Sequence, residues 1–222
     1  MSQEDPNVSQ WIALYVSTTS NKDDERNAAT QLVQQQMTQD PIASLHTSLS
    51  ILGASIDDPH TERLAKCQAA ILLSHVLRLK NPEDLQQKRL LLENSPLVDT
   101  FQQILKAHIF SPEKPIRNSC AQTFAILFII LGKQWLEIFH QLIELLSEEV
   151  APTNYCVINV MQEIITQPAF VAELAQNIQQ EILHVALICS KLLGKPKQSN
   201  ITDEDRLISA HFLYQLLLIC PS

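Results

Sequence analysis

Carboxylates are the first residues of this chain that could carry chemistry, and their spacing favours a structural role. Glu144, Glu148 and Glu149 are close enough in sequence to serve as an acid–base set. On an amphipathic helix, that spacing is more typical of a solvated polar face. The sequence has no glycine-rich phosphate loop, no HExxH and no GxSxG motif. We therefore expect no catalytic residues and no enzymatic activity.

Histidines are scattered rather than clustered: His46, His60, His75, His108, His140, His184 and His211. His108 and His140 could meet across packed helices, but a zinc site needs at least two further ligands. We expect neither a metal site nor a cofactor. Trp135 is a candidate partner anchor, but its place in an apolar stripe favours core packing.

The five cysteines (Cys67, Cys120, Cys156, Cys189 and Cys220) each lie in an apolar helical run, without a CxxC pair. This pattern favours small buried side chains in a reducing compartment. The segment Met1–Pro6 lacks the basic and apolar regions of a secretory signal. The longest apolar stretch, Phe124–Leu131, is shorter than the roughly 20 residues that span a bilayer. We expect a soluble intracellular protein.

The composition indicates an all-α protein. Of the 222 residues, 45% are hydrophobic and only 3 are glycine, and alternating β-branched runs are rare. The net charge of -8 disfavours nucleic acid, because phosphate binding needs clustered Lys and Arg. An acidic chain of this kind suits a basic protein partner better.

A repeated phrase indicates how the elements that position these side chains are organised. An Arg opens a helix, with small residues one turn later, at Arg26–Ala29, Arg63–Ala70, Ile116–Ala121 and, more weakly, Asp205–Ala210. Repeats of roughly 35 to 50 residues are typical of stacked helix pairs of the HEAT or armadillo kind. We predict one right-handed α-solenoid of about five such pairs over residues 1–222. Its default function is to bind other proteins on a concave face.

Apolar periodicity and turn residues predict eleven helices, over 7–18, 22–39, 41–55, 61–79, 82–93, 96–110, 115–131, 134–149, 153–167, 169–193 and 202–219. In the second, Ala28, Ala29, Leu32 and Val33 are expected to face inward. Gly132 is expected to end its helix in the left-handed conformation.

The last predicted helix, 202–219, is apolar on more than one side. Leu207, Phe212, Leu213, Leu216 and Leu217 exceed what one contact face can cover. We expect this chain to be part of a longer array, or another molecule to cover that end.

The order of these phrases resembles the N-terminal HEAT repeats of importin-β (karyopherin-β) nuclear transport receptors. The resemblance is carried by Arg26–Leu32 with Pro41 and the stripe 45–52, by Arg63–Leu77, by Ile116–Gly132 with Gln134–Phe139, and by Asn159–Ile165. The family's "Trp-Pro-Glu-Leu" phrase here has Leu136 in place of the proline. The branch stays open, since an importin-13-like or transportin-like relative fits the segment 169–201 equally well.

The resemblance implies that the second helices of the pairs (22–39, 61–79, 115–131, 153–167 and 202–219) line the concave face. In this family that face binds the GTP form of the small GTPase Ran, which couples cargo binding or release to transport. Phe-Gly repeats of nucleoporins bind between outer helices, mostly from about the fifth repeat on. The resemblance also implies a location in cytoplasm, nucleus and nuclear envelope.

Polar positions opposite the apolar stripes are the candidate protein-binding residues: Asp23, Arg26, Gln34, Glu62, Lys66, Arg78, Asn118, Gln122, Asn159, Gln162 and Glu163. Arg26, Arg63 and Arg117 are alternatively structural, each paired with an acid of the adjacent repeat. For the whole chain, the alternative to a transport receptor is a HEAT-repeat scaffold or adaptor for complex assembly outside transport.

Overall fold

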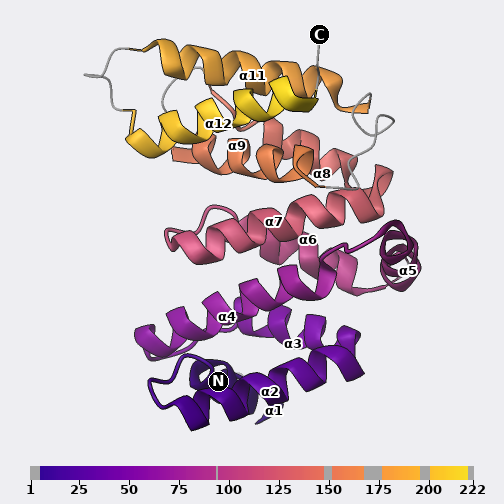
Figure 1. Ribbon diagram of the computed structural model, residues 1–222, viewed down its shortest axis with the longest axis vertical. Helices are drawn as coiled ribbons and strands as arrows, with labels where there is room; N and C mark the ends of the chain where they lie inside the picture. Colours follow the sequence, from indigo (N-terminus) through magenta and orange to yellow (C-terminus); the bar gives the residue numbers. More distant parts are fainter. Residues whose placement is uncertain (1–5, 94, 148–151, 168–176, 196–200, 220–222) are drawn as a thin grey trace. The chain divides into compact units, whose positions relative to one another are not determined.

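The computed structural model describes residues 6–93, 95–147, 152–167, 177–195 and 201–219. All regular structure in these ranges is helical, which confirms the all-α prediction (Figure 1). The helices are α1 (Pro6–Ser17), α2 (Asp23–Gln39), α3 (Pro41–Gly53), α4 (Pro59–Leu77), α5 (Pro82–Leu92), α6 (Leu97–His108), α7 (Lys114–Leu131), α8 (Lys133–Ile143), α9 (Pro152–Ile165), α11 (Gln179–Gly194) and α12 (Asp203–Ile219). None of these helices has the length and apolar character needed to cross a membrane.

Three helices start with the same device, an Asp or Asn followed by a proline. The Asp40 carboxylate accepts a bond from the Ala43 N–H at 2.9 Å, and that of Asp58 accepts one from the Thr61 N–H at 2.8 Å. The Asn81 side chain does the same for the Asp84 N–H at 2.8 Å. Each side chain satisfies an N–H that the first helical turn leaves unpaired, and the proline needs no such partner.

The described chain forms two compact units. Unit 1 comprises residues 1–78 and 95–120, and unit 2 comprises residues 79–94 and 121–222. In unit 1, α3 packs on α4 and α6. Leu45, Leu73 and Phe101 are completely buried between these helices. Helix α7 begins in unit 1 and ends in unit 2.

Helix α2 lies elsewhere than the repeat pattern predicts. It packs on α1 and α3, and α1 packs along α4. Tyr15 of α1 is 2% exposed and its hydroxyl bonds to that of Ser48 at 3.0 Å. On α2 only Ala29 and Val33 are buried. The expectation that Ala28 and Leu32 also face inward is wrong, because the more apolar α1 covers α4 and leaves α2 peripheral.

Unit 2 is built around the C-terminal half of α7, where residues 123–131 are all buried. Phe124 packs edge-on against Trp135 of α8 with ring centroids 4.9 Å apart, and Phe128 packs against Phe139 at 4.8 Å. Helix α12 packs on α9 and α11.

Gly132 separates α7 from α8 with φ 55° and ψ -117°. The positive φ agrees with the prediction, but this ψ lies outside the left-handed helical region. The Gly132 N–H still closes α7 by donating to the Phe128 carbonyl at 2.9 Å. The glycine therefore separates the two helices without extending α7 by a left-handed residue.

Two predicted helices are too long. Helix α8 ends at Ile143 rather than at 149, because Leu145 and Leu146 donate to carbonyls three residues back. The predicted helix 169–193 is interrupted at Ile178, which has φ -122° and ψ 22°, and α11 starts at Gln179. Its predicted first part, 169–176, lies outside the described residues.

The loop after α8 is closed by a side chain from α9. The buried Asn154 amide accepts a bond from the Ser147 N–H at 3.1 Å and donates to the Ser147 carbonyl at 2.9 Å. The Asn154 amide therefore satisfies both the N–H and the carbonyl of Ser147. These backbone groups need no helical hydrogen bonds, and the loop keeps its conformation.

Candidate functional site

The best-defined group of candidate site residues, here called the α9–α12 surface, consists of polar residues on α9, directly after its end, and on α12: Gln162, Glu163, Thr166, His211 and Gln215. Nε2 of Gln162 lies 2.9 Å from Nδ1 of His211, and Nε2 of Gln215 lies 3.2 Å from its Nε2. A neutral imidazole has one donor and one acceptor, so one of the two amides must present its oxygen.

Glu163 gives the α9–α12 surface a half-buried acid. Burial raises the pKa of its carboxyl. In the described part of the chain, no cation lies within ion-pair distance of it. A cationic group of a partner would offset the cost of keeping this carboxylate charged.

Asn159 is not part of this surface. It is 5% exposed, whereas Gln162 and Glu163 on the same helix reach solvent. The expectation that Asn159 lies on the polar, exposed side of its helix is therefore wrong. Most side chains of α9 are buried. A polar residue type is usually exposed, so the sequence did not indicate that Asn159 faces the core.

The N-terminal part of α4 carries a second group of charged residues. Lys66 pairs with Glu62 at 2.7 Å, and Arg63 lies 4.0 Å from Glu113, which precedes α7. Burial, with a smaller effect from Glu113, raises the pKa of the neighbouring Cys67 thiol. A raised pKa leaves little thiolate, so this cysteine is a poor nucleophile.

The three candidate residues on α2 (Asp23, Arg26 and Gln34) are separate from the charged group on α4, because α2 packs on α1 and α3. Asp23 and Arg26 form an ion pair within α2. Arg26 also donates to the Ser20 carbonyl at 3.1 Å. Gln34 is exposed on the same helix.

The repeated arginines have a structural function. Arg117 donates to the Ser111 carbonyl at 3.0 Å, and Arg206 donates to the Lys195 carbonyl at 3.1 Å. Arg26 and Arg117 both bond to a serine carbonyl six residues earlier. The structural alternative predicted acidic partners in the adjacent repeat and, for Arg117, a backbone carbonyl as the other possible partner. Arg63 with Glu113 fits the first and Arg117 with Ser111 is close to the second. Arg26, Arg117 and Arg206 all bind backbone carbonyls and so close the loops before their helices.

The remaining predicted residues are distributed along α4 and α7. Arg78 is exposed at the end of α4. Asn118 and Gln122 lie one turn apart on α7, both half-exposed, and belong to unit 1 and unit 2 respectively.

The tryptophan, histidines and glutamates considered for chemistry do not come together in one site among the described residues. Trp135 is fully buried, so the core interpretation is confirmed. His108 bonds to the Leu52 carbonyl at 2.9 Å, and His140 lies 2.9 Å from Glu181. Glu144 is exposed, whereas Glu148 and Glu149 lie outside the described residues. Within the described ranges, no three His, Cys, Asp or Glu side chains could together hold a metal ion.

The thiols of Cys120 in unit 1 and Cys189 in unit 2 are also buried. Burial raises the pKa of Cys120 to about 12 and that of Cys189 to about 11. Among the described residues, Cys67, Cys120, Cys156 and Cys189 form no disulfide bond, whereas Cys220 is outside the described part. These side chains act as small apolar groups, as their placement in apolar runs predicted.

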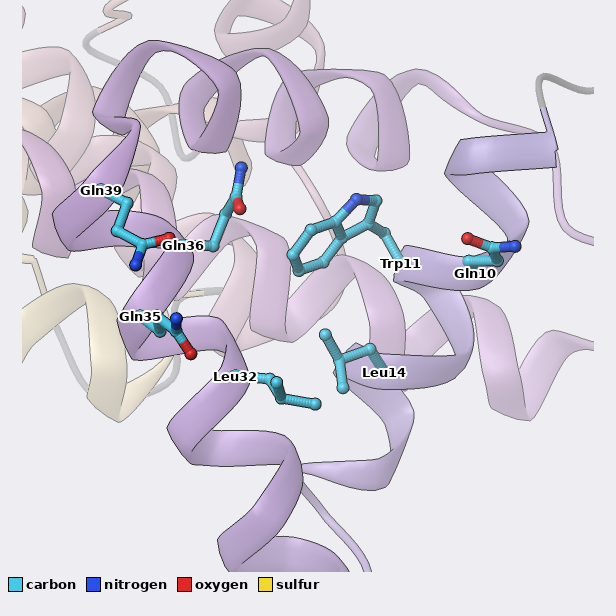
Figure 2. A pocket seen from close by; sticks show the side chains of 7 residues that line it. All are labelled: Gln10, Trp11, Leu14, Leu32, Gln35, Gln36 and Gln39. Atoms are coloured by element: carbon cyan, nitrogen blue, oxygen red, sulfur yellow. The ribbon is translucent and has the colours of Figure 1, made fainter.

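A groove between α1 and α2 was not predicted; it has a volume of about 500 Å³ and is lined by Gln10, Trp11, Leu14, Leu32, Gln35, Gln36 and Gln39 (Figure 2). Its trace in the sequence is the row of glutamines after Leu32 on one helix. Their shared face became a groove wall only because α1 packs beside α2.

No family model matches this sequence, and no curated protein matches it either. Among solved structures, a chain of the Kap95:Nup1 complex is similar, with a TM-score of 0.72 and 14% sequence identity. The similarity covers 95% of this chain and 24% of that chain, so this chain spans about a quarter of its neighbour's length. At this identity the similarity shows the fold, an α-solenoid of the HEAT kind.

Proposed function

We propose that this chain is a protein-binding HEAT-repeat module of a nuclear transport receptor, of the importin-β type, that binds the GTP form of Ran. The observation that carries the proposal is the shared fold with a chain of the Kap95:Nup1 complex over 95% of this chain. The motif order, from the phrase at Arg26 to that at Asn159, supports the same family from the sequence side.

The contact residues proposed here are those of α4 and of the α9–α12 surface: Glu62, Lys66 and Arg78 of unit 1, and Gln162, Glu163 and His211 of unit 2. They combine charged groups with amides, which suits a polar protein partner rather than an apolar ligand. The acidic net charge of -8 favours a partner with a basic contact face.

In this proposal, Ran-GTP and cargo compete by mass action. Each ligand favours its own conformation of the solenoid or uses an overlapping surface, so binding of one weakens binding of the other. The chain itself performs no reaction, and the proposed location is the cytoplasm, the nucleus and the nuclear envelope. Nucleoporin Phe-Gly segments are a further proposed partner, since the structural neighbour was solved with Nup1.

Calorimetric titration with Ran tests the proposal. Ran carrying a non-hydrolysable GTP analogue should bind saturably, and Ran-GDP should bind much more weakly. Equal affinity for the two forms, or no binding of either, contradicts it. In the second case, the alternative of a HEAT scaffold for complex assembly becomes the better explanation.

A matched pair of charge reversals locates the contact. Arg78→Glu, at the exposed end of α4, should weaken binding of the GTP form roughly ten-fold or more. Lys106→Glu makes the same change of charge at an exposed position on α6 and should leave the affinity unchanged. Equal losses in both variants would indicate a general electrostatic effect instead of a contact on α4.

A further inference from the structure

The groove between α1 and α2, here called the α1–α2 groove, combines an apolar side with an uncharged polar rim. Figure 2 shows Trp11 and Leu14 of α1 opposite Leu32 of α2, with four glutamines around them. Its volume of about 500 Å³ is in the range of small binding sites, roughly 300–1,000 Å³. It therefore has room for a short peptide segment.

The apolar side is held in place from behind. Trp11 packs edge-on against Tyr15 with ring centroids 6.0 Å apart, and Tyr15 is fixed by its bond to Ser48. Trp11 itself is only half-buried, and Leu32 is 55% exposed. A supported but uncovered indole beside an exposed leucine leaves apolar area that a ligand can remove from water.

The rim selects for an uncharged ligand. Gln10, Gln35, Gln36 and Gln39 supply amide donors and acceptors, and no charged side chain lines the groove. Among the described residues, no hydrogen bond joins these four amides to another group. A charged ligand would lose hydration here without meeting an opposite charge, whereas neutral carbonyls find donors.

These features distinguish an extended peptide from a helix. The backbone of a bound helix is already satisfied internally, so its carbonyls would form no new bonds with the glutamine amides, and Gln10, Gln35 and Gln39 would stay bonded to water. A polyproline II segment has free carbonyls along its length, and its rings pack on aromatic side chains. We propose that the α1–α2 groove binds an uncharged, proline-rich segment of another protein in the polyproline II conformation.

The two tryptophans of this chain allow a direct test, because Trp135 is fully buried and serves as an internal reference. A decaproline peptide is titrated into the ¹⁵N-labelled protein while the two indole N–H resonances are followed. The resonance of Trp11 should move saturably and that of Trp135 should stay in place. A Gly-Ser peptide of equal length should move neither.

Two matched variants complete the experiment. Leu32→Asp places a charge in the groove at an exposed position and should weaken decaproline binding roughly ten-fold or more. Leu90→Asp makes the same change at a 71% exposed leucine of α5 and should have no effect. The proposal fails if Trp11 does not respond, if the Gly-Ser peptide binds equally, or if the two variants behave alike. Preferential binding of an amphipathic helical peptide at Trp11 would also overturn it.

Discussion

The side-chain amide of Gln162 on α9 lies 2.9 Å from Nδ1 of His211 on α12. This contact joins residues 49 positions apart in the chain and ties together the two helices of the α9–α12 surface. A second amide, from Gln215, is 3.2 Å from the other ring nitrogen. The imidazole is therefore in contact with an amide at each nitrogen. Its orientation is fixed before a partner binds.

The contact between Gln162 and His211 predicts energetic coupling of the two side chains. In a double-mutant cycle of Gln162→Ala and His211→Ala, we expect a coupling of about 0.5–1.5 kcal/mol in the free energy of urea unfolding. The same cycle between Gln162→Ala and Gln34→Ala, on different units, should be additive within about 0.5 kcal/mol. Additivity in the first cycle would show that the contact contributes nothing to stability.

The half-buried Glu163 predicts a pH-dependent gain in stability when its charge is removed. Because burial raises its folded pKa above the unfolded value of about 4.3, the folded state binds more protons between these two values. The unfolding free energy contributed by this group therefore falls as pH rises through that interval. Glu163→Gln should be more stable than the parent chain at about pH 7, with no such gain at about pH 3.

Chemical unfolding at the two pH values measures this difference. Glu137→Gln, at an exposed position on α8, corrects for the loss of one negative charge from an acidic chain. A glutamine variant at 163 that is equally or less stable near neutral pH would contradict the assigned burial penalty.

Gly132 predicts a backbone effect that is separate from packing. An added Cβ would meet nothing within 4 Å, yet φ is +55°. Gly132→Ala should therefore destabilise the fold by about 1–3 kcal/mol through backbone strain alone. Gly194→Ala is the control, because it also has open space and lacks a positive φ. Equal thermal denaturation midpoints for the two variants would refute this reason for the glycine.

The bonds of Asn154 predict a substitution whose cost in stability becomes smaller in acid. Asn154→Asp keeps an oxygen for the Ser147 N–H but turns a second carboxylate oxygen toward the Ser147 carbonyl. We expect a loss of about 1–3 kcal/mol at neutral pH, with partial recovery in acid, where the carboxylic O–H can donate. Asn154→Ala, which cannot donate at any pH, should show no such recovery when unfolding is compared across pH.

Helix starts and the existence of the helices were predictable from local sequence. Asp40 before Pro41 supplies the capping acceptor and the proline within two residues, and α3 begins where it was predicted to begin. Asp58 and Pro59 do the same for α4, which begins two residues before its predicted start at 61. The apolar stripe of α8 likewise placed Trp135 in the core. These features depend on neighbours a few residues away, so local patterns contain the needed information.

Helix ends were less predictable. After α8 has ended at Ile143, Asn154 of the following helix bonds both backbone groups of Ser147, so this residue does not continue the predicted helix. Nothing in the apolar pattern of 134–149 indicates this bond. A helical pattern can continue in the sequence after a side chain from elsewhere has taken over its backbone groups.

The sequence by itself determined an all-α chain of repeated helix pairs, because apolar periodicity and turn residues act within each segment. Only the tertiary structure decided that α1 rather than α2 packs along α4, that Asn159 is buried, and that Gln162 meets His211. Periodicity shows that a helix has a face to bury, but not which helix covers it. That choice depends on which of several apolar faces, distant in sequence, buries the most area together.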